Sequence, residues 1–86
     1  MTNRKIIDIM INKELQTYYE ERFSMMSTQA WHQLMEDVQI MFENYSNINT
    51  VNTVEELQYR KGQLDIIQWL LSLEDISEAS YKELQE

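Results

Sequence analysis

The sequence contains no cysteine and no proline, and Gly62 is its only glycine. Without cysteine, the chain can form neither a disulfide framework nor a thiolate metal site, which fits a reducing compartment. Proline and glycine build most tight turns, so their scarcity disfavours a sheet of short hairpins and favours helices. Long apolar runs are also missing, because none approaches the ~20 residues that span a bilayer.

Basic residues are scarce as well. Seven Lys and Arg stand against 15 Asp and Glu, which gives a net charge of −8. Residues 24–52 carry no Lys or Arg at all. Binding to nucleic-acid phosphates requires a basic patch, so we expect no direct nucleic-acid partner. The first residues also lack the continuous apolar run and small-residue cleavage site of a signal peptide, so we expect neither secretion by that route nor a membrane partner.

What is present is helical periodicity. At 86 residues the chain allows one domain. We therefore predict a single all-α domain over residues 1–86, with three main helices plus a short C-terminal one, arranged as a bundle or an extended helical array. The expected helices cover about residues 3–23, 28–45, 53–73 and 75–84. Residues 46–52, rich in Asn and Ser, form the expected main loop.

The first two expected helices each carry an apolar arc, although Ile6, Ile9, Tyr19 and Phe23 lie off the arc of the first and Ile40 lies off that of the second. In the first, the face comprises Ile7, Met10, Ile11, Leu15 and Tyr18. In the second, apolar residues recur at spacings of three and four: Trp31, Leu34, Met35, Val38, Met41, Phe42 and Tyr45.

Capping signals mark the expected starts of the second, third and last helices. Ser27 is expected to cap the second helix, its hydroxyl accepting a hydrogen bond from a backbone N–H of the first turn. Thr53 and Glu56 are spaced as a capping box at the start of the third helix, and Asp75 is the expected cap of the last.

The third helix is apolar on two faces. One face consists of Tyr59, Gly62, Ile66, Trp69, Leu70 and Leu73, and the other of Leu57, Leu64, Ile67 and Leu71. A helix that is apolar over most of its circumference is buried on more than one side. Two interpretations stay open: the helix packs centrally between the first two helices, or its first face meets another protein chain. We predict that the six residues of the first face are interaction residues.

Gly62 is unusual in the middle of a helix, where glycine costs about 1 kcal/mol relative to alanine. Such a residue usually has a packing reason. We expect a close crossing with another helix, in this chain or in a partner, and a largely buried Trp69 on the same face. The alternative is that Gly62 is merely tolerated.

The same segment carries a resemblance. Its run from Val54 to Leu64 contains Arg60-Lys61-Gly62-Gln63, and Trp69-Leu70-Leu71-Ser72-Leu73 follows. This combination resembles helices in small structural proteins of tailed bacteriophages. The resemblance implies a virion or morphogenesis protein, present in the virion or in the host cytoplasm during assembly. Its partners would be copies of itself or other phage proteins such as capsid, portal or core proteins. No catalytic residue and no cofactor are implied.

Residues that could carry chemistry are few. His32 is the only histidine, and its pairing with Glu36 supplies too few ligands for a zinc or di-iron site. The acidic pairs Glu20-Glu21, Glu36-Asp37 and Glu55-Glu56 are adjacent in sequence and point about 100° apart on a helix, so they are typical of solvated faces. We predict no catalytic, metal or cofactor residues.

The sequence therefore favours a non-enzymatic structural or interaction protein in multiple copies. A second hypothesis uses the charge of −8. In it, the protein is an acidic inhibitor that binds a host nucleic-acid-binding protein by mimicking DNA.

Overall fold

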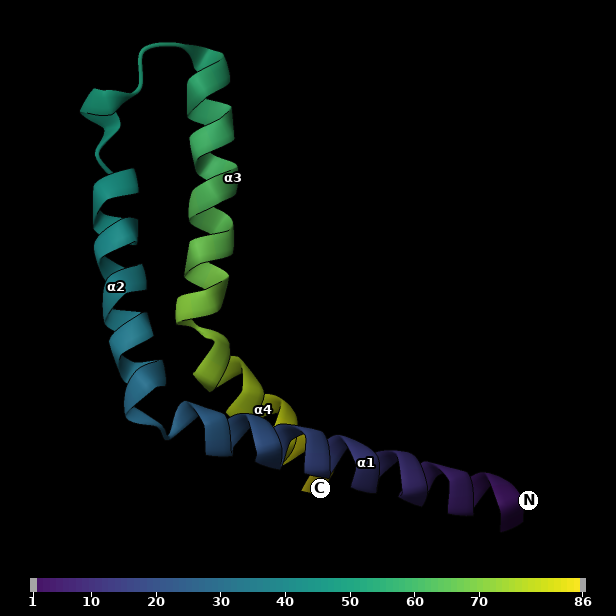
Figure 1. Cartoon of the computed structure of the whole chain (residues 1–86). Coiled ribbons are helices and arrows are strands. Elements are labelled where there is room, and N and C mark those ends of the chain that lie inside the picture. Colours follow the sequence, from purple (N-terminus) through teal and green to yellow (C-terminus); the bar gives the residue numbers. More distant parts are fainter. Residues whose placement is uncertain (1, 86) are drawn as a thin grey trace. The chain divides into compact units, whose positions relative to one another are not determined.

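The computed structural model describes residues 2–85, and side chains from Ile9 onward. The elements are α1 (Thr2–Met26), α2 (Gln29–Tyr45), the short 3-10 helix η1 (Ile48–Thr50), α3 (Val54–Leu71) and α4 (Leu73–Gln85) (Figure 1). No strand occurs among the described residues, so the predicted class of three main helices plus a shorter C-terminal one is confirmed. None of these helices combines the length and apolar character needed to cross a membrane.

The elements group into two compact units. One comprises α1 with α4 from Glu74 onward, and the other is the segment Gln29–Leu73. The single domain over residues 1–86 stays a prediction.

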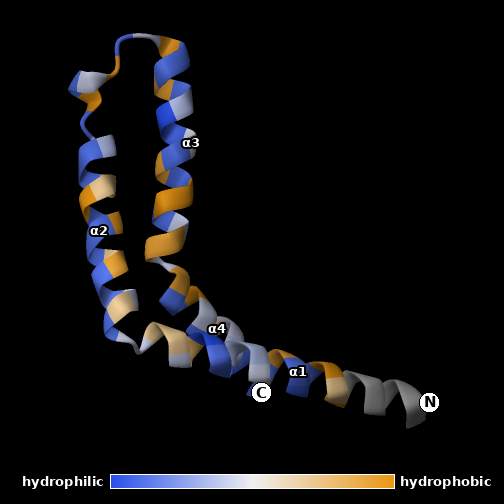
Figure 2. Cartoon of the chain, in the orientation of Figure 1, coloured by the Kyte–Doolittle hydropathy of each residue, from blue (hydrophilic) through white to orange (hydrophobic). Residues whose placement is uncertain are grey.

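The unit Gln29–Leu73 is a hairpin in which α2 and α3 run side by side in opposite directions (Figure 1). The covered side chains of α2 are Trp31, Met35, Val38, Phe42 and Tyr45, and those of α3 include Leu57, Arg60, Leu64, Ile67 and Leu71. Both sets follow the alternating spacing of three and four that keeps a stripe facing a partner helix. Figure 2 shows apolar residues along the side of α2 that faces α3. This shared stripe is the core of the hairpin.

The covered stripe of α2 is narrower than its apolar face. Leu34 is 51% exposed and Met41 is 43% exposed, although both belong to the apolar face of this helix. A single partner helix covers only the central stripe, whereas a bundle would also cover the flanks. The apolar face of α2 is therefore only partly covered by α3.

The start of α3 follows the capping prediction with one difference. The Thr53 hydroxyl accepts a hydrogen bond of 3.0 Å from the backbone N–H of Glu56. The Glu56 carboxylate accepts from the backbone N–H of Asn52 at 2.8 Å, one residue earlier than the usual capping box places it. Both bonds fix the direction in which the loop enters α3.

The other two caps differ from the predictions. The Ser27 hydroxyl donates to the carbonyl of Ser24 at 2.8 Å, and it lies at the end of α1 while α2 begins at Gln29. Asp75 lies inside the first turn of α4, because only Ser72 separates α3 from α4. Its carboxylate still favours that turn through the helix dipole.

The other unit joins the C-terminal half of α1 to α4. Ser77 of α4 is fully buried, and its hydroxyl accepts a hydrogen bond of 3.1 Å from the Arg22 guanidinium. The rings of Phe23 and Tyr81 meet edge to face at 5.5 Å. The Tyr81 hydroxyl donates to the Glu20 carboxylate at 2.9 Å, and this bond raises the pKa of Tyr81 above its ordinary 10.0.

The expected apolar face of α1 is open. Met10, Ile11, Leu15 and Tyr18 are all exposed, and the side chain of Ile7 lies outside those described. The α1–α4 contacts just described lie further along, at Glu20, Arg22 and Phe23.

Candidate interaction surface

The residues of α3 that point away from α2 form a straight apolar stripe. Tyr59, Gly62, Ile66 and Trp69 are spaced by three, four and three residues, and we call them the outer seam. Tyr59 is 73% exposed, Ile66 is 69% exposed and Trp69 is 54% exposed. Because the opposite face of α3 packs on α2, one helix carries a covered apolar stripe and an uncovered one.

Gly62 has no close neighbour among the residues that the structure describes. A Cβ built on it would meet nothing within 4 Å, and its backbone is ordinary helix without a positive φ. The predicted close crossing therefore does not occur within this chain. The predicted burial of Trp69 within the chain is also wrong. Within the unit Gln29–Leu73, α3 packs on α2 through one face only, and the outer seam stays uncovered.

Leu70 and Leu73 occupy the edge of the same face. Both are half-buried, and Leu73 is the first residue of α4. Tyr59, Gly62, Ile66 and Trp69 are thus placed together on an open surface, while these two lie at its border. The role of all six as interaction residues remains a prediction.

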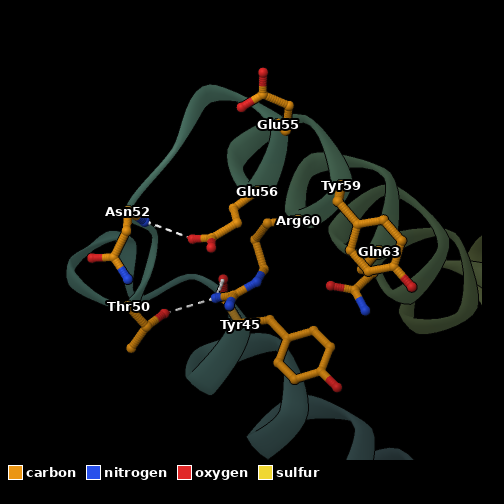
Figure 3. Close-up of a pocket in the computed structure, with 8 residues that line it drawn as sticks. All are labelled: Tyr45, Thr50, Asn52, Glu55, Glu56, Tyr59, Arg60 and Gln63. Carbon is orange, nitrogen blue, oxygen red and sulfur yellow. Dashed lines mark hydrogen bonds between the residues drawn. The ribbon is translucent and has the colours of Figure 1, made fainter.

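A hollow of about 600 Å³ opens beside the N-terminal end of the outer seam (Figure 3). It lies between the loop that follows α2 and the first turns of α3. Its lining combines polar and charged side chains with two tyrosine rings, and consists of Tyr45, Thr50, Asn52, Glu55, Glu56, Tyr59, Arg60 and Gln63. Tyr59 belongs to both the hollow and the outer seam, so the two features are continuous.

Arg60 organises this end of the hairpin. Its guanidinium donates to the carbonyl of Tyr45 at 3.1 Å and to the hydroxyl of Thr50 at 2.9 Å. It also lies 5.4 Å from the centre of the Tyr45 ring, within cation–π range. Figure 3 shows the guanidinium extended from α3 toward the loop. Arg60 thus ties α3 to the end of α2 and to η1.

Sequence reasoning did not assign this role to Arg60. The available signal was its position: it occupies a place in the inner stripe of α3 between Leu57 and Leu64. A charged residue in an apolar stripe needs a partner that satisfies it. Here the partners are a helix-end carbonyl and a loop hydroxyl.

Acidic groups surround these features. Every Asp and Glu side chain between residues 9 and 85 is exposed. Two acidic residues lie close to the outer seam: Glu55 at the N-terminal end of the seam and Asp65 on the flank of the seam. Lys61 lies one turn before Asp65. His32 is exposed on α2. Over the side chains described, no group of three or more His, Asp and Glu is arranged to hold a metal ion.

No family model, curated protein or solved structure matches this chain. The resemblance of residues 54–73 to small phage proteins therefore stays a prediction.

Proposed function

We propose that this protein is a non-enzymatic structural or interaction protein that binds other protein chains through the outer seam of α3. The observation that carries the proposal is the contrast between the two faces of that helix. Ile67 is 8% exposed against α2, whereas Tyr59, Ile66 and Trp69 are exposed on the other side. Aromatic residues are enriched at the centres of protein interfaces, where they supply most of the apolar contact.

The proposed setting is a tailed-phage particle, in which the protein is a small component present in several copies. This part of the proposal is supported by the resemblance of residues 54–73. The segment that resembles phage structural proteins contains the whole outer seam. Its partners would be further copies of the chain or capsid, portal or core proteins.

Quantitative mass spectrometry of purified particles tests this proposal. Particles would be made in cells that supply either the wild-type chain or Ile66→Glu, which places a charge on the outer seam. Gln68→Glu is the matched control, because Gln68 is exposed on the same helix but off the seam. We expect the wild type and Gln68→Glu in particles at equal copy number, and Ile66→Glu to be strongly depleted. Absence of the wild-type chain from particles would contradict the proposal, as would equal incorporation of Ile66→Glu.

A second candidate function rests on the acidic surface. Because every described carboxylate is exposed, the chain offers negative charge on each helix. Such a surface suits an inhibitor that occupies the DNA site of a host protein. That inhibitor would displace duplex DNA from a basic protein, and the displacement would weaken as salt screens the charges. Competition measured by fluorescence anisotropy at low and high salt separates this function from binding through the outer seam.

A further inference from the structure

We propose that the outer seam of α3 binds the outer seam of a second copy of this chain in antiparallel orientation. In this dimer, Ile66 of each copy fills the space above Gly62 of the other. The inference rests on the proposed function, because it names the partner for that same surface.

The side chains along the outer seam match those of a second outer seam that runs in the opposite direction. Gly62 and Ile66 stand at the centre, and Tyr59 and Trp69 lie three residues beyond them on either side. A two-fold axis between Gly62 and Ile66 therefore sets each Gly62 against an Ile66 and each Tyr59 against a Trp69. The spacing of three and four keeps all four positions in line along the contact.

A parallel pair would fit less well. It would place Gly62 against Gly62 and leave a void between the helices, while Ile66 and Trp69 would each meet their own kind. Voids forfeit dispersion contacts, and protein interfaces reach the packing density of interiors. Antiparallel pairing instead puts a large residue into each space that a missing side chain leaves.

The dimer also explains Gly62. Glycine weakens a helix relative to alanine, and nothing within the chain requires its small size, since a Cβ there meets no atom within 4 Å. A side chain inserted from a second copy does require it. The inserted side chain, Ile66, and the space it fills, above Gly62, lie four residues apart on the same helix, so every copy supplies both.

Charge sets an observable signature for this partner. The seam itself is uncharged, but each copy carries −8, so two copies repel at long range. Salt screens this repulsion, and the dimer should strengthen as salt rises. A basic partner on the same surface would show the opposite dependence.

The contact area predicts a weak dimer. Buried aromatic side chains contribute roughly 150–250 Å² each. With Tyr59 73% exposed and Trp69 54% exposed, the four aromatic residues of a pair supply roughly 400–600 Å². Even with the two Ile66 side chains added, the total stays below the roughly 1,200 Å² at which standard specific interfaces begin, in the range of weak and transient contacts. We therefore expect dissociation in the range of about 10 μM to 1 mM.

Sedimentation equilibrium of the full chain tests the proposal. Wild type, Gly62→Leu and Gln68→Leu would be compared across that concentration range at low and high salt. Gly62→Leu fills the hole on an open helix face, and Gln68→Leu adds a similar side chain off the seam. Circular dichroism verifies that all three stay helical.

We expect the wild type and Gln68→Leu to dimerise with similar constants that tighten with salt. The constant for Gly62→Leu should weaken by at least about tenfold, since overpacking a filled site is unfavourable. A wild type that stays monomeric up to about 1 mM would overturn the second copy as partner. The proposed function would then still be tested separately, by the mass spectrometry of purified particles. Equal dimerisation of Gly62→Leu would overturn the seam as the dimer contact.

Discussion

Ile66 and Ile67 are adjacent in α3, yet 69% of the surface of Ile66 is exposed and only 8% of that of Ile67. Ile67 packs in the hairpin and Ile66 stands on the outer seam. In dilute protein, Ile67→Ala should lower the free energy of unfolding by about 2–5 kcal/mol, because it leaves a cavity. Ile66→Ala should change it by no more than about 0.5 kcal/mol. Urea unfolding measures both changes in free energy. Equal losses for the two variants would show that α3 does not pack on α2 through the face that carries Ile67.

Arg60 bonds to the segment between α2 and α3, so replacing Arg60 should loosen that segment. In Arg60→Met the apolar stem is kept, but the bonds to the Tyr45 carbonyl and the Thr50 hydroxyl are lost. We expect a cost of about 1.5–3 kcal/mol, the usual range for hydrogen bonds to a charged group, reduced where water replaces them. Hydrogen exchange should speed up at the backbone amides of residues 49–53. Lys61→Met, at the exposed neighbour, should leave the exchange rates of these amides unchanged. Equal acceleration in both variants would contradict the role of the Arg60 hydrogen bonds in holding this segment.

Gly62 should respond oppositely in the single chain and in the dimer. A Cβ at this position meets no atom within 4 Å. Gly62→Ala should therefore stabilise the dilute monomer by about 0.5–1 kcal/mol through helix propensity and a less flexible unfolded chain. Thermal or urea unfolding at low concentration measures the gain. A loss of stability in the monomer would reveal an intrachain contact at Gly62 that the structure lacks.

Tyr81 should make the α1–α4 unit sensitive to alkali. Its pKa is raised above 10.0, first because its hydroxyl donates to Glu20. A raised folded-state pKa means that the stabilisation is fully present below pH 10 and is lost as pH rises through the folded-state value. In an alkaline titration followed by tyrosinate absorbance, the Tyr81 contribution should be absent in Tyr81→Phe and shifted to lower pH in Glu20→Gln. A titration of Glu20→Gln that matches the wild type would exclude this bond as the cause.

Periodicity was sufficient to find the helices, since apolar residues at spacings of three and four mark them whatever covers them. The Thr53 cap was also predictable because it is local, made between residues three apart. The extent of burial was not predictable. The apolar pattern shows that Trp69 and Ile66 share a face. A single amino-acid sequence does not show how many helices are available to cover that face.

Two further features needed the tertiary structure. The position of Arg60 in an apolar stripe becomes meaningful only when the loop brings Thr50 and the Tyr45 carbonyl to it. The start of α4 shifted from Asp75 to Leu73 because α3 ends at Leu71 and Ser72 alone makes the break. Capping residues favour a start without fixing it, and a neighbouring helix end can override them.

The chain has no cysteine, so introduced cysteines report the dimer contact without background. The most direct measurement is oxidation of an equimolar mixture of Gly62→Cys and Ile66→Cys, followed by mass spectrometry of the intact products. The antiparallel dimer sets these two positions face to face, and the paired substitutions keep the local volume roughly constant. A predominant mixed disulfide joining Gly62→Cys to Ile66→Cys is the predicted result. Predominant disulfides of Gly62→Cys with itself, or no disulfide above that of an exposed control, Lys61→Cys, would contradict the antiparallel seam.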